Sequence, residues 1–233
     1  MISLKRVAIL DRIIENNKLF DRFIVYGGLI TSLIVTFILV DFDRGIIKNF
    51  FPVLTITLGL IASRLTAKKN RLGPVLGISS DVLMIIVAYA FGNIGALGIS
   101  ALNIGFRTLA LVNWGNLEKS KNETQYYTIK ERGVKFVYAC LMAVAVIGIY
   151  FALNKAFLEH VSMLELTIFI FGTFGALFLA FSLKSAYIVF IVTASLLFIS
   201  YNGSGNYVNA SSILFYNLNN FWACYYWYIY KVK

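Results

Sequence analysis

Charged residues are scarce in this 233-residue sequence, at 14% of the chain, whereas hydrophobic residues reach 59% and the mean hydropathy is +0.77. A soluble globular domain has roughly a quarter of its residues charged and about 45–50% apolar. The shortage of charge therefore excludes an ordinary water-soluble globule. The apolar residues come in blocks of about twenty, the length that a helix needs to cross a bilayer. We expect an all-α, polytopic membrane protein.

Cysteine, proline and histidine are also rare, with two, two and one residues. Cys140 and Cys224 both fall within apolar blocks, which argues against a disulfide framework. His160 is in a short connector and is interpreted as a solvated loop residue. The sequence contains no zinc-ligand spacing, glycine-rich phosphate loop or nucleophile motif. These absences argue against an enzyme and predict neither a cofactor nor a bound metal.

Eight apolar segments can be placed along the chain, and each predicts a transmembrane helix. The connectors between them are too short to hold a soluble domain, so any function has to be carried out within the helix bundle. The eight segments are 23–40, 47–66, 72–91, 96–114, 134–153, 163–183, 185–201 and 207–227.

Successive connectors lie on alternate sides of the membrane, and the basic residues are unequally divided between these two sides. With the N-terminus in the cytosol, seventeen Lys and Arg residues fall on the inner side, and only Arg44, Lys48 and Lys155 fall on the outer side. Inner loops of membrane proteins carry an excess of Lys and Arg, so both termini are predicted to be cytosolic. Because these cations are scattered over separate connectors, the net charge of +10 does not predict a nucleic-acid partner.

A weak internal repeat overlays residues 54–114 on 166–227, with the Gly-Asn pair at 92–93 aligned to that at 205–206. Each unit holds three predicted spans, and the span 134–153 lies between them. This order predicts a parallel 3+1+3 repeat after one extra helix, with a substrate site between the units near mid-membrane. The predicted parts are a cytosolic or interfacial segment 1–22, the extra helix and its outer loop 23–46, a first unit 47–114, a cytosolic loop and linker helix 115–153, a second unit 163–227 and a cytosolic tail 228–233.

Asp81 and Arg107 are charged residues deep within neighbouring predicted spans, at similar depth. A charge at the bilayer centre costs at least about 2.5–3.5 kcal/mol, so such residues face a partner or a water-filled cavity. We predict an ion pair between them. It can fix the packing of two helices, contact substrate directly, or do both.

Polar and aromatic residues share helical stripes on the third span of each unit. The first stripe contains Asn103, Arg107 and Trp114, and Tyr187 and Thr193 occupy the span before the second stripe. Asn side chains donate and accept hydrogen bonds, and Trp and Tyr rings stack on flat heterocycles. Interfacial anchoring of Trp and hydrogen bonding of Asn between helices are the alternatives. The second stripe and its neighbours contribute Tyr216, Asn217, Asn219, Asn220 and Trp227 as candidate substrate-binding residues.

Three features carry a family resemblance: the 3+1+3 plan, the stretch Leu-Gly-Pro-Val-Leu-Gly-Ile-Ser-Ser-Asp at 72–81, and Trp114 and Trp227 at the ends of the third spans. In these features the sequence resembles the PnuC family of vitamin transporters, which are bacterial relatives of the SWEET sugar carriers. The resemblance covers about residues 50–230. Spans equivalent to 185–201 often carry Trp and Asn in that family, whereas this segment has no Trp.

The resemblance implies a bacterial inner-membrane carrier that moves an unphosphorylated vitamin or nucleoside, typically nicotinamide riboside, by facilitated diffusion. A cytosolic kinase would trap the product without stable binding. Thiamine, riboflavin and deoxynucleosides are alternative substrates of the same fold. A substrate-binding subunit of an energy-coupled vitamin importer is the alternative class, and a membrane-embedded enzyme or sensor is a third. The sequence is compatible with a monomer or a homo-oligomer.

Overall fold

All regular structure in the described part of the chain is helical. The computed structural model describes residues 18–39, 45–68, 70–119, 129–153 and 161–228. This confirms the predicted all-α class. The helices are α2 (Lys18–Leu39), α3 (Gly45–Asn49), α4 (Phe51–Ala67), α5 (Leu72–Phe91), α6 (Ile94–Lys119), α7 (Ile129–Leu153), α9 (Met163–Ala180), α10 (Ala186–Gly203) and α11 (Tyr207–Tyr228).

Six helical segments among the described residues are long and apolar enough to cross a membrane. They are α2, the combined segment Gly45–Ala67, α5, the first part of α6, α9 and α10. In α7 the segment Gly133–Gly148 is apolar. Helix α11 has 22 residues, but asparagine, serine and tyrosine are frequent in it. The predicted membrane character is confirmed, and six of the eight predicted spans meet this criterion of length and composition among the described residues.

Two helices differ in extent from the predicted segments. Helix α2 includes residues 18–22, which were predicted to precede the first span. The predicted span 47–66 is divided at Phe50 into α3 and α4, with Pro52 in the first turn of α4. Proline lacks the N–H that a helix interior needs, but its fixed φ suits a first turn. His160 lies outside the described residues.

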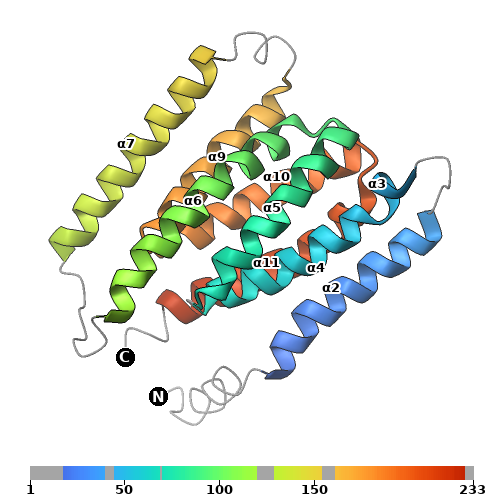
Figure 1. Cartoon of the computed structure of the whole chain (residues 1–233), viewed down its shortest axis with the longest axis horizontal. Coiled ribbons are helices and arrows are strands. Elements are labelled where there is room, and N and C mark those ends of the chain that lie inside the picture. Colours follow the sequence, from blue (N-terminus) through green and yellow to red (C-terminus); the bar gives the residue numbers. More distant parts are fainter. Residues whose placement is uncertain (1–17, 40–44, 69, 120–128, 154–160, 229–233) are drawn as a thin grey trace, which may run out of the picture.

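Six helices form a closed ring in the order α4, α5, α6, α9, α10 and α11, each packed on the next and α11 returning to α4. Helix α2 packs outside the ring on α4 and α11, and α7 packs outside it on α9. Figure 1 shows α2 and α7 at opposite edges of the bundle. The ring therefore consists of two consecutive runs of three helices, joined at the contacts of α6 with α9 and of α4 with α11.

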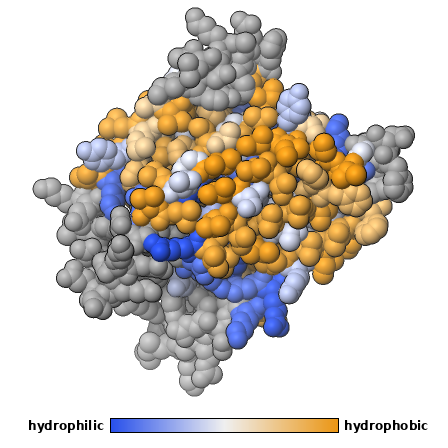
Figure 2. Space-filling model, viewed as in Figure 1, coloured by the Kyte–Doolittle hydropathy of each residue, from blue (hydrophilic) through white to orange (hydrophobic). Residues whose placement is uncertain are grey.

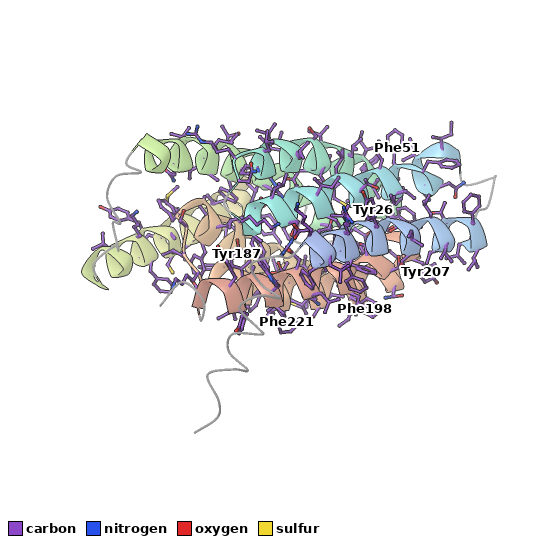
Figure 3. The ribbon with its side chains drawn as sticks, turned by 90° about the horizontal axis from the view of Figure 1, so that it is seen from below. Tyr26, Phe51, Tyr187, Phe198, Tyr207 and Phe221 are labelled. Carbon is purple, nitrogen blue, oxygen red and sulfur yellow. The ribbon has the colours of Figure 1, made fainter. Side chains whose placement is uncertain are left out.

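The molecule exposes many large hydrophobic side chains and buries many polar ones besides its hydrophobic core, unlike a soluble protein. Leu19 and Phe37 are each 81% exposed, whereas Asn206 and Asn219 are fully buried. Figure 2 shows a broad hydrophobic surface across the middle of one face. In Figure 3, Phe198 and Phe221 lie along the outer margin of the bundle while Tyr187 lies among the helices. Lipid is the solvent that suits such a surface.

Candidate functional site

A cavity of about 200 Å³ occupies the centre of the helix ring, and all six ring helices contribute to its wall. Most of its polar groups are uncharged, and Asp81 and Arg107 supply the only charges among the lining residues. The other polar lining residues are Ser63, Thr66, Ser80, Ser100, Asn103, Tyr187, Thr193, Tyr201, Asn209, Ser212, Tyr216 and Asn220.

The predicted ion pair forms in the wall of this cavity. Arg107 on α6 donates from Nε to Oδ2 of Asp81 on α5, over 2.5 Å. The side chain of Asn103, one turn earlier on α6, also interacts with the Asp81 carboxylate. Gly77 makes this geometry accessible, because a Cβ at that position would collide with the Arg107 guanidinium. The pair therefore depends on a glycine one turn from Asp81.

Aromatic rings form much of the remaining wall. Tyr187 and Phe190 on α10 lie edge to face, with ring centres 6.5 Å apart, and both line the cavity. The Tyr187 hydroxyl donates to the main-chain oxygen of Thr66 on α4 at 3.4 Å. Tyr216 approaches α4 at Gly59, where a Cβ would collide with its hydroxyl. Such rings can stack on a flat heterocycle, and their faces attract cations.

The structure brings seven of the eleven predicted substrate-binding residues to one cavity. These are Asp81, Asn103, Arg107, Tyr187, Thr193, Tyr216 and Asn220, from α5, α6, α10 and α11. The predicted stripes on the third spans therefore face each other across the ring.

The other four predicted residues are placed differently. Asn219 is fully buried and does not line the cavity: Arg64 Nη1 donates to its Oδ1 at 3.2 Å, and its Nδ2 donates at 2.7 Å to Oγ of Ser63, a lining residue. Asn217 lies on α11 and does not line the cavity. Trp114 and Trp227 belong to α6 and α11, but their side chains are outside the described part of the structure. Asn219 thus joins helices, the alternative considered for the asparagines.

Sequence reasoning missed a whole wall of the cavity, that of α4. Gly59, Ser63 and Thr66 line it at spacings of four and three residues. This is the helical periodicity that marks a single face, so the signal was present in the sequence. Tyr201 and Asn209 were also missed. Asn209 extends the polar stripe of α11 by one turn beyond Ser212.

No group of three His, Cys, Asp or Glu side chains in the described residues could hold a metal ion. The cavity instead offers hydrogen bonds, rings and one neutralised ion pair. Chemically, it can bind a polar solute of small size.

Comparison with known proteins decides the family. Residues 49–229 match the family described as nicotinamide mononucleotide transporter. The chain belongs to this family. As a member of the nicotinamide mononucleotide transporter family it is a membrane transporter and not an enzyme, and the predicted PnuC resemblance is confirmed.

The fold of this family member also agrees with a solved structure, the "Crystal structure of the Vitamin B3 transporter PnuC". The two share a TM-score of 0.65 and 14% sequence identity, over 89% of this chain and 90% of the other. At this identity the likeness establishes the fold. No curated protein matches the chain.

Proposed function

We propose that the chain carries an unphosphorylated heterocyclic vitamin or nucleoside, first of all nicotinamide riboside, across a bacterial inner membrane by facilitated diffusion. The observation that supports this is the charge balance of the central cavity. Its single cation, Arg107, is already bound to its single acid, Asp81. A phosphate would meet no free positive charge there, whereas the hydroxyls of a nucleoside meet neutral donors and acceptors. Cytosolic phosphorylation would then trap the transported product.

The aromatic wall supports a flat ring as part of the substrate. Nicotinamide riboside carries a cationic pyridinium ring and a carboxamide, which suit the faces of Tyr187 and Phe190 and the amides of Asn103 and Asn220. A transporter named for vitamin B3 has the same fold. Thiamine, riboflavin and deoxynucleosides share the flat ring and are the alternative substrates. Trp114 and Trp227 remain candidates for stacking.

We also propose eight spans in a parallel 3+1+3 repeat, with both termini cytosolic. The two runs of three helices in the ring support the repeat, and so do two matching turns. Gly92 and Gly205 both have positive φ, of 69° and 74°. The following residues, Asn93 and Asn206, each donate from the main chain to the oxygen five residues earlier. Lys68 and Arg71 on the α4–α5 connection support a cytosolic position for that end.

Ligand binding to purified protein tests the substrate. Nicotinamide riboside, nicotinamide mononucleotide, thiamine, riboflavin and a deoxynucleoside are compared by thermal shift and then by calorimetry. A ligand at one hundred times its Kd stabilises the folded state by about 2.7 kcal/mol. We expect stabilisation by nicotinamide riboside and none by the mononucleotide. Tighter binding of the mononucleotide would overturn the proposal, and a response to another vitamin would replace the substrate.

Two variants on α10 test whether the ligand binds in the cavity. Tyr187→Leu removes a ring from the cavity wall, and Phe198→Leu removes a ring that is 49% exposed on the outer face of the same helix. We expect the first to weaken ligand binding about tenfold, since one stacked ring contributes about 1–3 kcal/mol. The second should leave affinity unchanged. Equal effects would place the binding site elsewhere.

Flux into liposomes that hold only this protein separates a carrier from a subunit of an energy-coupled importer. We expect uptake of radiolabelled substrate down its gradient, without ATP and without proton or sodium gradients. Uptake that appears only with an added ATPase complex would favour the importer subunit. Uptake abolished by collapse of the ion gradients would contradict facilitated diffusion.

A further inference from the structure

A network of polar side chains lies at the end of the ring where α5 turns into α6 and α10 turns into α11. Asn206 donates from Nδ2 to Oδ1 of Asn93 at 3.4 Å, and Asn209 donates to Oδ1 of Asn206 at 3.0 Å. Asn93 donates from its own Nδ2 to Ser204 at 2.8 Å and to Ser200 at 3.2 Å. At most 2% of the surface of each of the three asparagines is exposed. We call these residues, with Glu165, the asparagine network.

Glu165 on α9 connects this network to a further helix. Its Oε2 accepts from the main-chain N–H of Gly95 at 2.5 Å, and its Oε1 accepts from the hydroxyl of Ser200. Gly95 lies in the first turn of α6, where a carboxylate is favoured by the free N–H groups of the helix. A Cβ at Gly95 would collide with Glu165. The carboxylate therefore ties the start of α6 to α9 and α10.

The network spans the boundary between the two runs of three helices. Asn93 and Gly95 belong to the first run, and Glu165, Ser200 and Asn206 belong to the second. Asn209 is both a member of the network and a lining residue of the cavity. The chain of hydrogen bonds thus leads from the cavity to Glu165 and lies between the cavity and this end of the bundle.

The opposite end of the cavity is joined by a different set of contacts. There the Tyr187 hydroxyl donates to the oxygen of Thr66 at 3.4 Å, and Arg64 Nη1 on α4 donates to Oδ1 of Asn219 on α11 at 3.2 Å. Hydrogen bonds to a charged group are about twice as strong as neutral ones. In the asparagine network the charged group is Glu165, with two such bonds, and at the opposite end it is Arg64. Different hydrogen bonds therefore have to break for each end of the cavity to open.

We propose that the asparagine network is the gate that closes this end of the cavity, and that Glu165 is the positioning residue that holds it shut. The inference rests on the proposed transport function. With the proposed orientation it is the outer gate. Entry of substrate from this side requires Glu165 to release Ser200 or Gly95, and the Asn93–Asn206 contact to part.

The rate at which a cysteine in the cavity reacts with a thiol reagent measures opening of the gate, and it requires no substrate. Ser100→Cys places a reporter in the cavity, in a background with Cys140→Ala and Cys224→Ala, and Ser212→Cys gives a second reporter. A membrane-impermeant maleimide is applied to right-side-out and to inside-out vesicles. Ile46→Cys, at a 68% exposed position on α3, identifies the vesicle face to which this end of the bundle belongs. Helix α3 lies at this end because Lys48 contacts the ring of Phe91.

Glu165→Gln retains size but offers one acceptor oxygen where the structure uses two. We expect the reporter to be labelled about tenfold faster from the Ile46 face, the change expected when a hydrogen bond to a charged group is lost. Ser200→Ala should act in the same direction. Thr167→Val is the matched control, because its hydroxyl bonds only the Met163 oxygen of its own helix.

Unchanged labelling from the Ile46 face in both Glu165→Gln and Ser200→Ala would overturn the gate, as would an increase from the opposite face alone. An equal increase in Thr167→Val would also overturn it, because loosening of α9 would then explain the effect. The labelling result does not depend on which solute is carried. A protein that binds none of the tested vitamins can still show the gate, and a vitamin-binding protein can still refute it.

Discussion

Arg107 and Asp81 are bound to each other across the contact of α6 with α5, Nε to Oδ2 at 2.5 Å, in the wall of the central cavity. Each neutralises the other in a region where an isolated charge is costly. The pair therefore fixes the position of two helices and leaves the cavity without net charge. Its loss should affect folding and ligand binding together.

A double-mutant cycle separates the pair from its members. Asp81→Asn leaves Arg107 buried without its partner, and we expect a loss of about 3–5 kcal/mol of stability. The double variant Asp81→Asn with Arg107→Gln removes both charges and should recover much of that loss. Thermal unfolding in detergent measures both. A double variant no more stable than either single variant would show that the charges do not stabilise each other.

Gly77 gives a second test of the same geometry. A methyl group at this position collides with the Arg107 guanidinium, so Gly77→Ala should displace Arg107 from Asp81 and cost about 1–3 kcal/mol by overpacking. Gly105→Ala on α6 is the matched control, because nothing lies within 4 Å of its added Cβ. We expect a lower unfolding temperature and weaker ligand binding for the first variant alone. Equal stability of the two would contradict the close packing.

Some features could be predicted because the information is local. The segment 72–91 coincides with α5, which ends where Gly92 adopts a left-handed conformation. The polar stripe on 96–114 faces the cavity because helical periodicity fixes which residues share a face. Asp81 and Arg107 pair as predicted because few other partners exist at that depth.

Other features depend on contacts between distant segments and could not be predicted. Arg64 lies near the end of a span and was assigned to the cytosolic side. In the structure it is 3% exposed, with its guanidinium 3.7 Å from the centre of the Trp222 ring. That burial requires α2 and α11, which meet α4 only in the folded protein. Asn219 and Asn220 were grouped together, although adjacent helical residues point about 100° apart.

The contacts of Arg64 predict that the extra first helix, α2, is held to the ring through this residue. Arg64 donates from Nε to Oδ1 of Asp21 on α2 at 2.5 Å, and also contacts the ring of Phe20. It thereby joins α2 to α4 and α11. Arg64→Lys should destabilise the protein by a few kcal/mol, about what breaking a buried pair costs. The reason is that an ammonium group cannot stack on an aromatic ring and donate several hydrogen bonds at the same time, as a planar guanidinium does. Thermal unfolding measures this.

Lys68 is the matched control for Arg64, because it pairs with the same Asp21 but its side chain is 39% exposed. Exposed pairs contribute about 0–1 kcal/mol, so Lys68→Met should be nearly neutral. If Lys68→Met were as destabilising as Arg64→Lys, the charge of Asp21 rather than the buried stacking would hold α2 in place.

Asn219 and Asn220 are neighbours in sequence with different surroundings, and they should separate stability from binding. Asn219 accepts from Arg64 and donates to Ser63, so Asn219→Ala leaves buried groups unpaired and should cost about 1–3 kcal/mol of stability. Asn220 lines the cavity, so Asn220→Ala should weaken ligand binding about tenfold with little effect on unfolding, the loss expected for one hydrogen bond. Thermal unfolding and calorimetry on the same two preparations measure both quantities. If Asn219→Ala weakened binding while Asn220→Ala did not, the ligand would occupy a site other than the central cavity.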